Sequence, residues 1–472
     1  MKKYFRTIGM VCSISIVAIA TVFSAGCGTE KPKEKTTKEN VTEEIISEEV
    51  NNNGSFLVTV GDVLYFRDYP VSSMETVSIG KGHMGKISAG KKSYICSYDK
   101  TTGKVTKLAE DEYGGKLYYS GDAIYTNNEN SDAPQYAKIS LKDGSVKELG
   151  EGRIDGISED GALLAIKEMN NNTENKITVV RTTDQSQVTT IEKKDALVNY
   201  IGFYKNSLVY EWDETVIYDP EKEEKVSDFS DYYAVHHICQ QDLNSTDEIS
   251  IGTITLPFME DMEKGEASIE NGNATVKGYQ DIYFNEGIIS GNRVGISYQV
   301  AEGTGSIFSY GYIASATLEQ ADSLEQVEYI RGTAMEDALP DGEKGNTSYD
   351  EMPQIWFDKE KKLVCGMHRW SSAYLSGNTL IYVDENGKEQ EVTKEYATED
   401  GSDTEISQKD AFDYSETFVV DGEKIYSVRE KIQRKPEDDA GWREAFELKQ
   451  LEYCEISIAD GTVKVFQVEE RN

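Results

Sequence analysis

The fold is decided by the stretch Gly121-Asp122-Ala123-Ile124-Tyr125 and by Ser140-Leu141-Lys142-Asp143-Gly144-Ser145-Val146, which follows it. Each part joins a tight turn to a short apolar run. Asp-Gly and Asn-Gly pairs suit the positive φ angles that two-residue hairpin turns require. The stretch therefore predicts two consecutive β-hairpins, which together contain four antiparallel strands.

The first hairpin signal recurs along the chain. Copies lie at Gly61–Tyr65, Asp160–Leu164, Asn206–Tyr210 and Asp421–Tyr426, and looser ones at Glu286-Gly287-Ile288-Ile289 and Lys361-Lys362-Leu363-Val364. The second signal recurs at Tyr98–Val105, Arg181–Val188, Tyr218–Val226, Ala321–Val327, Asp384–Val392 and Ile458–Val463. The two signals alternate, so they predict seven units of four strands each.

The spacing of these units is typical of a β-propeller. Gly103, Gly144 and Gln185 are 41 residues apart in succession, and one propeller blade takes roughly 40–50 residues. A β-sandwich also contains many short strands, but it lacks this regular doublet of turns. We therefore expect an all-β chain with a single propeller over residues 55–470, built from seven four-stranded blades.

Three long insertions interrupt the expected repeat. They lie at residues 69–92, 230–277 and 432–448. The second contains a hairpin signal of its own, Ile269-Glu270-Asn271-Gly272-Asn273-Ala274-Thr275-Val276. This hairpin leaves open a degenerate eighth blade.

The N-terminus carries a secretory signal. A basic start, Met1–Arg6, precedes an apolar segment, Ile8–Phe23, and then Ser24-Ala25-Gly26-Cys27. The last four residues resemble the lipobox of bacterial lipoproteins, although Ser24 stands where that family usually has Leu. The resemblance implies removal of residues 1–26, lipidation (such as palmitate) at Cys27, and a location on the extracytoplasmic side of the cell membrane. An ordinary signal peptide, cut at a nearby small residue, is the alternative.

Residues 27–54 are expected to form a disordered tether. They are rich in Lys, Glu, Thr and Asn and contain no aromatic residue, so they bury too little apolar surface to offset the entropy of ordering. The repeated turn units behind a lipobox look like uncharacterised bacterial lipoproteins with TolB-like or WD-repeat-like propellers. That resemblance covers nearly all of residues 55–470 and implies fold and location only.

The charge of the chain restricts its partners. The full sequence has a net charge of −36, and the signal segment removes three basic residues and no acid. Nucleic-acid binding is not expected, because it needs clustered Lys and Arg. Docking on anionic lipid heads is disfavoured too, so membrane attachment should come from the lipid anchor alone.

Metal and cofactor signals are weak throughout the chain. No cofactor is expected, and the acid-rich turns Asp384–Gly387 and Glu399–Asp403 suggest at most weak calcium binding. His236-His237 with Cys239 is a cluster of soft ligands, but adjacent side chains on a strand point to opposite faces. One buried and one exposed histidine is therefore favoured over a zinc site.

The remaining cysteines are Cys96, Cys239, Cys365 and Cys454. They are spread along the chain without a C-x-x-C pair, so they form neither a disulfide framework nor a zinc pattern. Buried single thiols are favoured, and one disulfide stays open in an extracytoplasmic setting.

Aromatic residues supply the candidate binding site. His368, Arg369, Trp370 and Tyr374 are expected in the middle connection of the sixth blade, and Trp442 in the last insertion. Exposed rings in loops bind proteins or stack on sugars, whereas rings packed between blades are structural. Both roles stay open for these five residues.

The predicted function is non-catalytic recognition of an envelope protein or a glycan. No G-x-S-x-G elbow or H-E-x-x-H motif is present, and no catalytic residue is assigned. The alternative is an extracytoplasmic carbohydrate-active hydrolase or lyase that uses acidic residues near the propeller channel. The sequence leaves open whether the protein is an enzyme.

Overall fold

The computed structural model is built of antiparallel strands. It describes residues 49–70, 79–80, 83–84, 91–128, 134–168, 175–194, 196–217, 232–254, 267–270, 273–276, 280–302, 308–326, 347–349, 354–357, 363–371, 379–383, 389–391, 411–434 and 446–466. Over these residues no helix is long and apolar enough to cross a bilayer. The described strands form seven sheets of four or five strands and two isolated hairpins.

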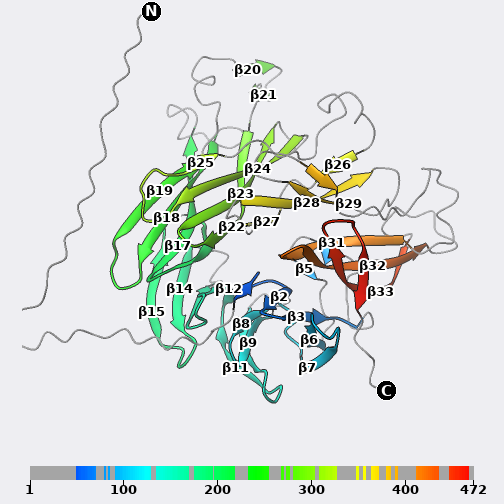
Figure 1. The fold of residues 1–472 in the computed structure, drawn as a ribbon. Coiled ribbons are helices and arrows are strands. Elements are labelled where there is room, and N and C mark those ends of the chain that lie inside the picture. Colours follow the sequence, from blue (N-terminus) through cyan, green and yellow to red (C-terminus); the bar gives the residue numbers. More distant parts are fainter. Residues whose placement is uncertain are drawn as a thin grey trace, which may run out of the picture. The chain divides into compact units, whose positions relative to one another are not determined.

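The first four sheets follow one another in chain order (Figure 1). The first contains β1 (Val50–Asn51), β2 (Leu57–Val60), β3 (Val63–Asp68), β6 (Ser93–Asp99) and β7 (Val105–Asp111). The second contains β8 (Tyr118–Ser120), β9 (Ala123–Asn127), β10 (Gln135–Ser140) and β11 (Val146–Glu151). The third contains β12 (Arg153–Ile157), β13 (Leu163–Lys167), β14 (Lys176–Arg181) and β15 (Gln187–Glu192). The fourth contains β16 (Val198–Tyr204), β17 (Ser207–Ile217), β18 (Tyr232–Asp242) and β19 (Glu248–Ile254).

The last three sheets repeat this order. The fifth contains β22 (Gln280–Ser290), β23 (Arg293–Glu302), β24 (Phe308–Thr317) and β25 (Glu325–Gln326). The sixth contains β26 (Thr347–Tyr349), β27 (Gln354–Phe357), β28 (Leu363–Ser371), β29 (Thr379–Val383) and β30 (Glu389–Glu391). The seventh contains β31 (Ala411–Asp421), β32 (Lys424–Arg434), β33 (Phe446–Ser457) and β34 (Val463–Phe466). The two isolated hairpins are β4–β5 (Ile79–Gly80, His83–Met84) and β20–β21 (Ala267–Glu270, Asn273–Val276).

The seven sheets are the blades of a closed β-propeller. Their innermost strands contact one another in chain order. The contacting pairs are β8 with β12, β12 with β16, β16 with β22, β22 with β27, β27 with β31, and β31 with β2. A bridge between Ser55 and Leu117 joins the first two blades. The expected all-β propeller with seven blades is confirmed, and the hairpin β20–β21 is a two-stranded sheet instead of an eighth blade.

The order of strands gives the propeller two different faces. In the six blades whose turns are described, the first strand is joined to the second, and the third to the fourth, by turns on one side, which we call the turn face. The ends of the second strands and the starts of the first and third strands lie on the opposite side, which we call the insertion face. The alternating strand direction of an antiparallel sheet requires this division.

The turn face is tied together by one repeated hydrogen bond. In six blades the amide after the third strand donates to a carbonyl in the turn between the first two strands. The pairs, all at 2.8–3.0 Å, are Lys100 N–Asp62 O, Leu141 N–Asp122 O, Thr182 N–Ala162 O, Leu243 N–Asn206 O, Leu318 N–Asn292 O and Ile458 N–Glu423 O. Gly144 has the positive φ that its Asp-Gly pair predicted, and Gly103 and Gln185 adopt a positive φ at the equivalent positions.

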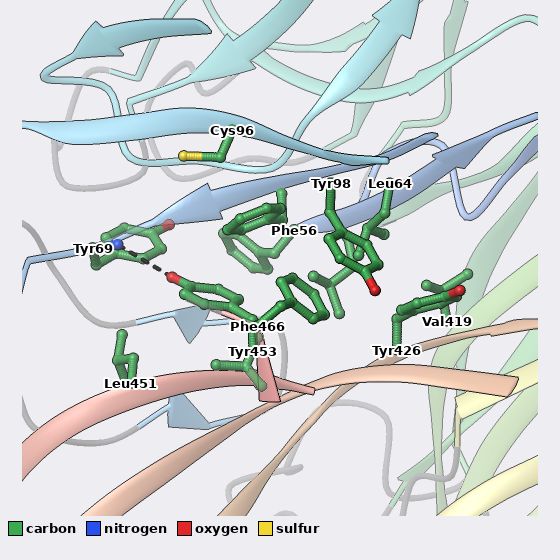
Figure 2. Packing of buried hydrophobic residues seen from close by; sticks show 13 residues of the cluster. Phe56, Leu64, Tyr69, Cys96, Tyr98, Val419, Tyr426, Leu451, Tyr453 and Phe466 are labelled. Carbon is green, nitrogen blue, oxygen red and sulfur yellow. Dashed lines mark hydrogen bonds between the residues drawn. The ribbon is translucent and has the colours of Figure 1, made fainter. Parts of the chain in front are cut away.

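An aromatic cluster closes the ring between the last and the first blade (Figure 2). The rings of Tyr98 and Phe466 stack with centroids 4.1 Å apart, and those of Phe66 and Tyr453 lie 4.5 Å apart. The Tyr453 hydroxyl donates to the Arg67 carbonyl at 2.9 Å. Among the described strands none is shared between the two blades, and the packed side chains join them.

The fourth blade corrects the expected position of an insertion. Strands β18 and β19 lie inside the range 230–277 and form the outer hairpin of this blade. The turn signal at Tyr218–Val226 is therefore not the outer turn, which lies at residues 243–247. The reason is pairing length: all eleven residues of β17 pair with β18, and that pairing outweighs a local turn signal.

Two other turn assignments also change. Glu286-Gly287-Ile288-Ile289 lies within strand β22, and the turn follows at Gly291, which has φ of +58°. Residues 432–434 and 446–448 belong to β32 and β33, so the last insertion is shorter than 432–448. The first insertion agrees with residues 69–92, since β3 ends at Asp68 and β6 begins at Ser93.

The folded domain begins earlier in the chain than the sequence predicts. Residues 50–54 fall within the predicted tether, but Val50–Asn51 forms β1 and pairs with Val60 and Thr59 of β2. Side-chain hydrogen bonds of the following asparagines hold this segment, because Asn52 and Asn53 bond to carbonyls of neighbouring strands.

Candidate functional site

Buried polar side chains occupy the same position in successive blades. Each lies five residues after the turn between the first and second strands, and each is fully excluded from solvent. The set, which we call the polar girdle, is Arg67, Asn127, Lys167, Glu211 and Ser297. Because burying a polar group is costly unless it is hydrogen-bonded, each member must be explained by its partners.

Arg67 joins the first blade to the second. Its Nε donates to the Gly115 carbonyl at 2.8 Å and its Nη2 to Thr126 Oγ1 at 2.8 Å. Its Nη1 lies 2.6 Å from Asp111 Oδ2, and both side chains of this ion pair are fully buried. The guanidinium thereby fixes the backbone that leads into β8, the innermost strand of the next blade.

Asn127 makes the same connection one blade later. Its Nδ2 donates to the Ile154 carbonyl at 3.0 Å, and its Oδ1 accepts from the Ile154 amide at 2.8 Å. Lys167 continues the series, since its Nζ donates to Asn199 Oδ1 at 3.2 Å. In both cases the contacted residue opens the innermost strand of the following blade, on the insertion face.

Glu211 and His236 complete the series between the fourth and fifth blades. Glu211 Oε2 accepts from Asn199 Nδ2 at 2.7 Å, and Glu211 Oε1 lies 2.6 Å from His236 Nδ1. His236 Nε2 lies 2.9 Å from the Ile282 carbonyl. Carboxylate and carbonyl oxygens are acceptors, so both ring nitrogens face acceptors and the geometry favours the imidazolium form of His236.

The electrostatics of this network agree with its geometry. Burial by itself would lower the pKa of His236, but the hydrogen bond and charge of Glu211 outweigh burial and raise it. The Ile282 carbonyl and Asp213 act in the same direction. A continuous chain of hydrogen bonds thus runs from Lys167 through Asn199, Glu211 and His236 to the fifth blade.

Glycines at bulges bring the innermost strands close together. The pairing of β12, β16 and β22 with their neighbours slips by one residue at Gly156, at Gly202 and just before Gly287. A Cβ on Gly156 would lie 1.9 Å from the ring of Tyr200, and one on Gly202 would lie 2.7 Å from Ile289. Only glycine permits this approach.

The network and the bulges support the mouth of the propeller on the insertion face. Gly202 lies beside Ile289 and Gly287 beside Ile201, so β16 and β22 run in parallel and begin at the same face. Leu197 directly precedes β16 and is 47% exposed, and Tyr283 is the fourth residue of β22 and is 45% exposed. Two large apolar side chains are therefore exposed in adjacent blades; we call this pair the mouth pair.

His236 and its strand partner Asp213 hold the backbone beside both members of the mouth pair. Asp213 pairs with His236 across β17 and β18, and Asp213 Oδ1 accepts from the Leu197 amide at 2.5 Å. The His236 imidazolium bonds Ile282, which directly precedes Tyr283. The buried network therefore positions the backbone of both exposed residues.

Three carboxylates of the third and fourth blades act as fixed acceptors. Glu211 bonds Asn199 and His236, and Asp213 bonds the Leu197 amide. Asp155 Oδ1 accepts from Arg153 Nε at 2.8 Å. Each of these groups holds a strand end in place, which suits a preorganised binding surface.

The neighbouring histidine lies on the other side of β18. The His237 ring stacks on Trp212 with centroids 4.1 Å apart, and its Nε2 lies 3.0 Å from Glu214 Oε2. The prediction that His236 and His237 point to opposite faces is confirmed. Among the described residues, no three His, Cys, Asp or Glu side chains are grouped as a metal site.

The thiols whose side chains are described are buried. Cys96, Cys239 and Cys454 form no disulfide bond, as the sequence favoured, and burial raises the pKa of Cys239 to about 12. Cys365 lies on β28, and its side chain is outside the described residues.

The binding residues predicted from the sequence fall largely outside the described part. His368, Arg369 and Trp370 lie on strand β28 instead of in a connection, because residues 363–371 pair with β26, β27 and β29. Their side chains, Tyr374, Trp442, Cys27 and the two acid-rich turns proposed for calcium lie outside the described residues.

Many tyrosines link one blade to the next. Tyr118 donates to the Ile154 carbonyl at 2.5 Å, and Tyr125 to the Thr182 carbonyl at 3.0 Å. Tyr136 and Tyr200 make similar bonds to Gln185 and Ile157. The abundance of tyrosine thus has a structural explanation in these blades.

Sequence reasoning missed the polar girdle and the mouth pair. The girdle has a sequence signal, since its members lie five residues after Asp62, Asp122, Ala162, Asn206 and Asn292. Alignment of the repeats on their turns would have revealed it. The mouth pair has no such signal, because exposure of Leu197 and Tyr283 depends on neighbouring blades.

Comparison with known proteins finds similar solved structures at low sequence identity. The chain is similar to the β-propeller domain of the Trilobed protease from Pyrococcus furiosus, with 11% identity over 86% of this chain and 96% of that chain (TM-score 0.42). It is similar to TolB from Acinetobacter baumannii (10%, 70% and 63%, TM-score 0.34) and to an ulvan lyase (8%, 82% and 92%, TM-score 0.46). No protein-family model and no curated protein matches the chain.

Proposed function

We propose that this chain is a membrane-anchored extracytoplasmic lipoprotein whose β-propeller recognises another component of the cell envelope without catalysis. The mouth pair carries the proposal. Leu197 and Tyr283 are exposed at one level of adjacent blades, near the starts of β16 and β22 on the insertion face. Exposed apolar side chains on a rigid scaffold are typical of binding surfaces.

The surrounding chemistry favours a protein partner over a glycan. An aliphatic side chain such as Leu197 packs on apolar side chains, whereas sugar binding relies on aromatic stacking and free polar groups. The carboxylates of Glu211, Asp213 and Asp155 are already held, by Asn199 and His236, by the Leu197 amide and by Arg153 respectively. Given the net charge of −36, a partner with a basic surface would associate fastest.

The anchoring part of the proposal rests on the sequence from Met1 to Cys27. Its test is fractionation of cells that express the chain or its Cys27→Ala variant. The wild-type chain is expected in the membrane fraction and the variant in the soluble extracytoplasmic fraction. Retention of the variant at the membrane would overturn the lipid anchor.

The recognition part is tested by photo-crosslinking in intact cells. A photoreactive residue at position 197 or 283 is expected to give a discrete covalent adduct that protease degrades. The matched control is position 142, an exposed lysine on the turn face. An adduct sensitive to glycan-degrading enzymes would identify a glycan instead, and equal adducts at position 142 would overturn the proposal.

A further inference from the structure

The place where the chain enters the propeller is fixed by the first sheet. The amide of Gly61, in a turn of the turn face, donates to the Glu49 carbonyl at 3.1 Å. Val50 pairs with Val60 and Asn51 with Thr59. The first described residues therefore lie beside the end of β2 that meets the turn face.

The direction of β1 follows from this pairing. β1 is antiparallel to β2, and β2 begins at the insertion face and ends at Gly61. The short strand β1 must then begin at the turn face and run toward the insertion face. Residues that precede Glu49 are consequently delivered at the turn face, at the inner edge of the first sheet.

Two asparagines hold the entering chain to three blades. Asn52 Nδ2 donates to the Leu57 carbonyl at 2.9 Å and to the Phe418 carbonyl of the last blade at 3.4 Å. Asn53 exchanges two bonds with Tyr119 of the second blade, at 3.0 Å and 2.7 Å. The point of entry is thus part of the ring and does not swing around it.

We infer that the tether holds the turn face toward the membrane, so that the insertion face and its mouth pair are presented to partners approaching from the opposite side. This inference rests on the proposed lipid anchor. It adds to that proposal the surface that is displayed. It requires the partner to approach the side of the propeller that faces away from the bilayer.

The length of the linker supports this orientation. Residues 28–48 comprise 21 residues, and a flexible chain of that length has a root-mean-square span of roughly 23–27 Å. The eleven residues of β17 alone extend about 36 Å between the faces. To turn the insertion face toward the bilayer, the linker would have to stretch from the inner edge around the outside of the blades.

Matched labelling sites exist on the two faces. Lys142 lies in the turn between β10 and β11 on the turn face, and Lys194 lies between β15 and β16 on the insertion face; both are exposed. Each is changed to cysteine in a chain with Cys365→Ala, because Cys96, Cys239 and Cys454 are buried. Residues 1–27 are replaced by a histidine tag that binds vesicles containing nickel-chelating lipid.

The measurement is energy transfer from a dye on each cysteine to acceptor-labelled lipid headgroups. The Lys142→Cys dye is expected to transfer about twice as efficiently as the Lys194→Cys dye, given faces separated by a strand length. Equal transfer, or stronger transfer from position 194, would overturn the inference.

Tethering by the other terminus supplies the control. Strand β34 is the outer strand of the last blade and runs from the turn at Gly461 toward the insertion face. A chain held by a C-terminal tag should therefore reverse the order of the two dyes. The vesicle assay does not use Cys27, so failure of the lipid anchor and failure of the orientation give different results.

Discussion

Arg67 Nη1 lies 2.6 Å from Asp111 Oδ2, and both side chains are fully buried. The carboxylate also accepts from the amides of Tyr113 and Gly114. One ion pair thereby organises the connection from the first blade to the second. It exemplifies the polar girdle, in which a buried polar side chain of one blade fixes the start of the next.

Arg67→Met should destabilise the propeller severely. The variant leaves Asp111 buried without its cation, and loss of one partner of a buried pair costs about 3–5 kcal/mol. Urea unfolding followed by tryptophan fluorescence measures the change. Arg153→Met removes an arginine that is 35% exposed and paired with Asp155; this matched control should cost less than about 1 kcal/mol. Equal losses in the two variants would contradict the girdle's structural role.

Tyr453→Phe should weaken the closure between the last and first blades. The hydroxyl contacts the Arg67 carbonyl, Asp68 Oδ1 and the Tyr69 amide, and its loss should cost about 1–3 kcal/mol because buried partners lose a bond. Tyr94→Phe is the control: Tyr94 packs on the same cluster and holds Lys107 over its ring, a contact that Phe retains. Thermal unfolding of both variants gives the comparison, and a Tyr453→Phe midpoint no lower than that of Tyr94→Phe would count against a hydrogen-bonded seam.

Gly156→Ala should produce a clash between the third and fourth blades. Its Cβ would lie 1.9 Å from a ring carbon of Tyr200, and overpacking of this kind costs roughly 1–3 kcal/mol or more. Adding Tyr200→Leu to Gly156→Ala should recover part of the loss, which a double-mutant cycle of unfolding free energies measures. Gly422→Ala meets no atom within 4 Å but has φ of +62°, so it reports backbone strain alone. Purely additive effects of Gly156→Ala and Tyr200→Leu would exclude the clash.

The coupling between Glu211 and His236 should depend on pH. The folded state raises the pKa of His236 above its ordinary value of 6.5. Stabilisation by the imidazolium is therefore fully present below about pH 6.5 and is lost as the pH rises through the folded-state pKa.

A double-mutant cycle with Glu211→Gln and His236→Gln measures this coupling. It should be about 1–3 kcal/mol at pH 6 and should shrink at alkaline pH. His237→Gln, which alters the imidazole on the other side of the strand, is the matched control for losing a histidine from β18. A coupling that stays constant from pH 5 to 9, or grows with pH, would refute the charged network.

The N-terminal boundary of the folded domain should lie before residue 50. A chain that begins at Glu49 keeps β1 and the bonds of Asn52 and Asn53, whereas one that begins at Ser55 loses them. We expect the shorter chain to be less stable by about 2–4 kcal/mol, since each lost bond is worth roughly 0.5–1.5 kcal/mol. Chemical unfolding of the two chains provides the test, with Asn53→Ala in the longer chain as an intermediate case. Equal stability of the two chains would mean that the folded domain begins at residue 55.

The turns could be predicted from the sequence because their chemistry is local. Gly144 and Gly461 have the positive φ angles that the Asp-Gly signals implied. The same reasoning failed at Glu286-Gly287, where the glycine serves a bulge. A glycine needed for close packing against Ile201 looks identical, in the sequence, to a glycine needed for a turn.

The sequence by itself determined the repeated hairpins, and with them the all-β propeller, because turn angles and strand alternation depend on neighbouring residues. The tertiary structure decided what lies between the blades: which face Leu197 and Tyr283 share, why Arg67 and Glu211 are buried, and where the chain enters at Glu49. These features depend on contacts between residues tens to hundreds of positions apart. Local patterns carry no record of such contacts, so only the closed ring of blades reveals them.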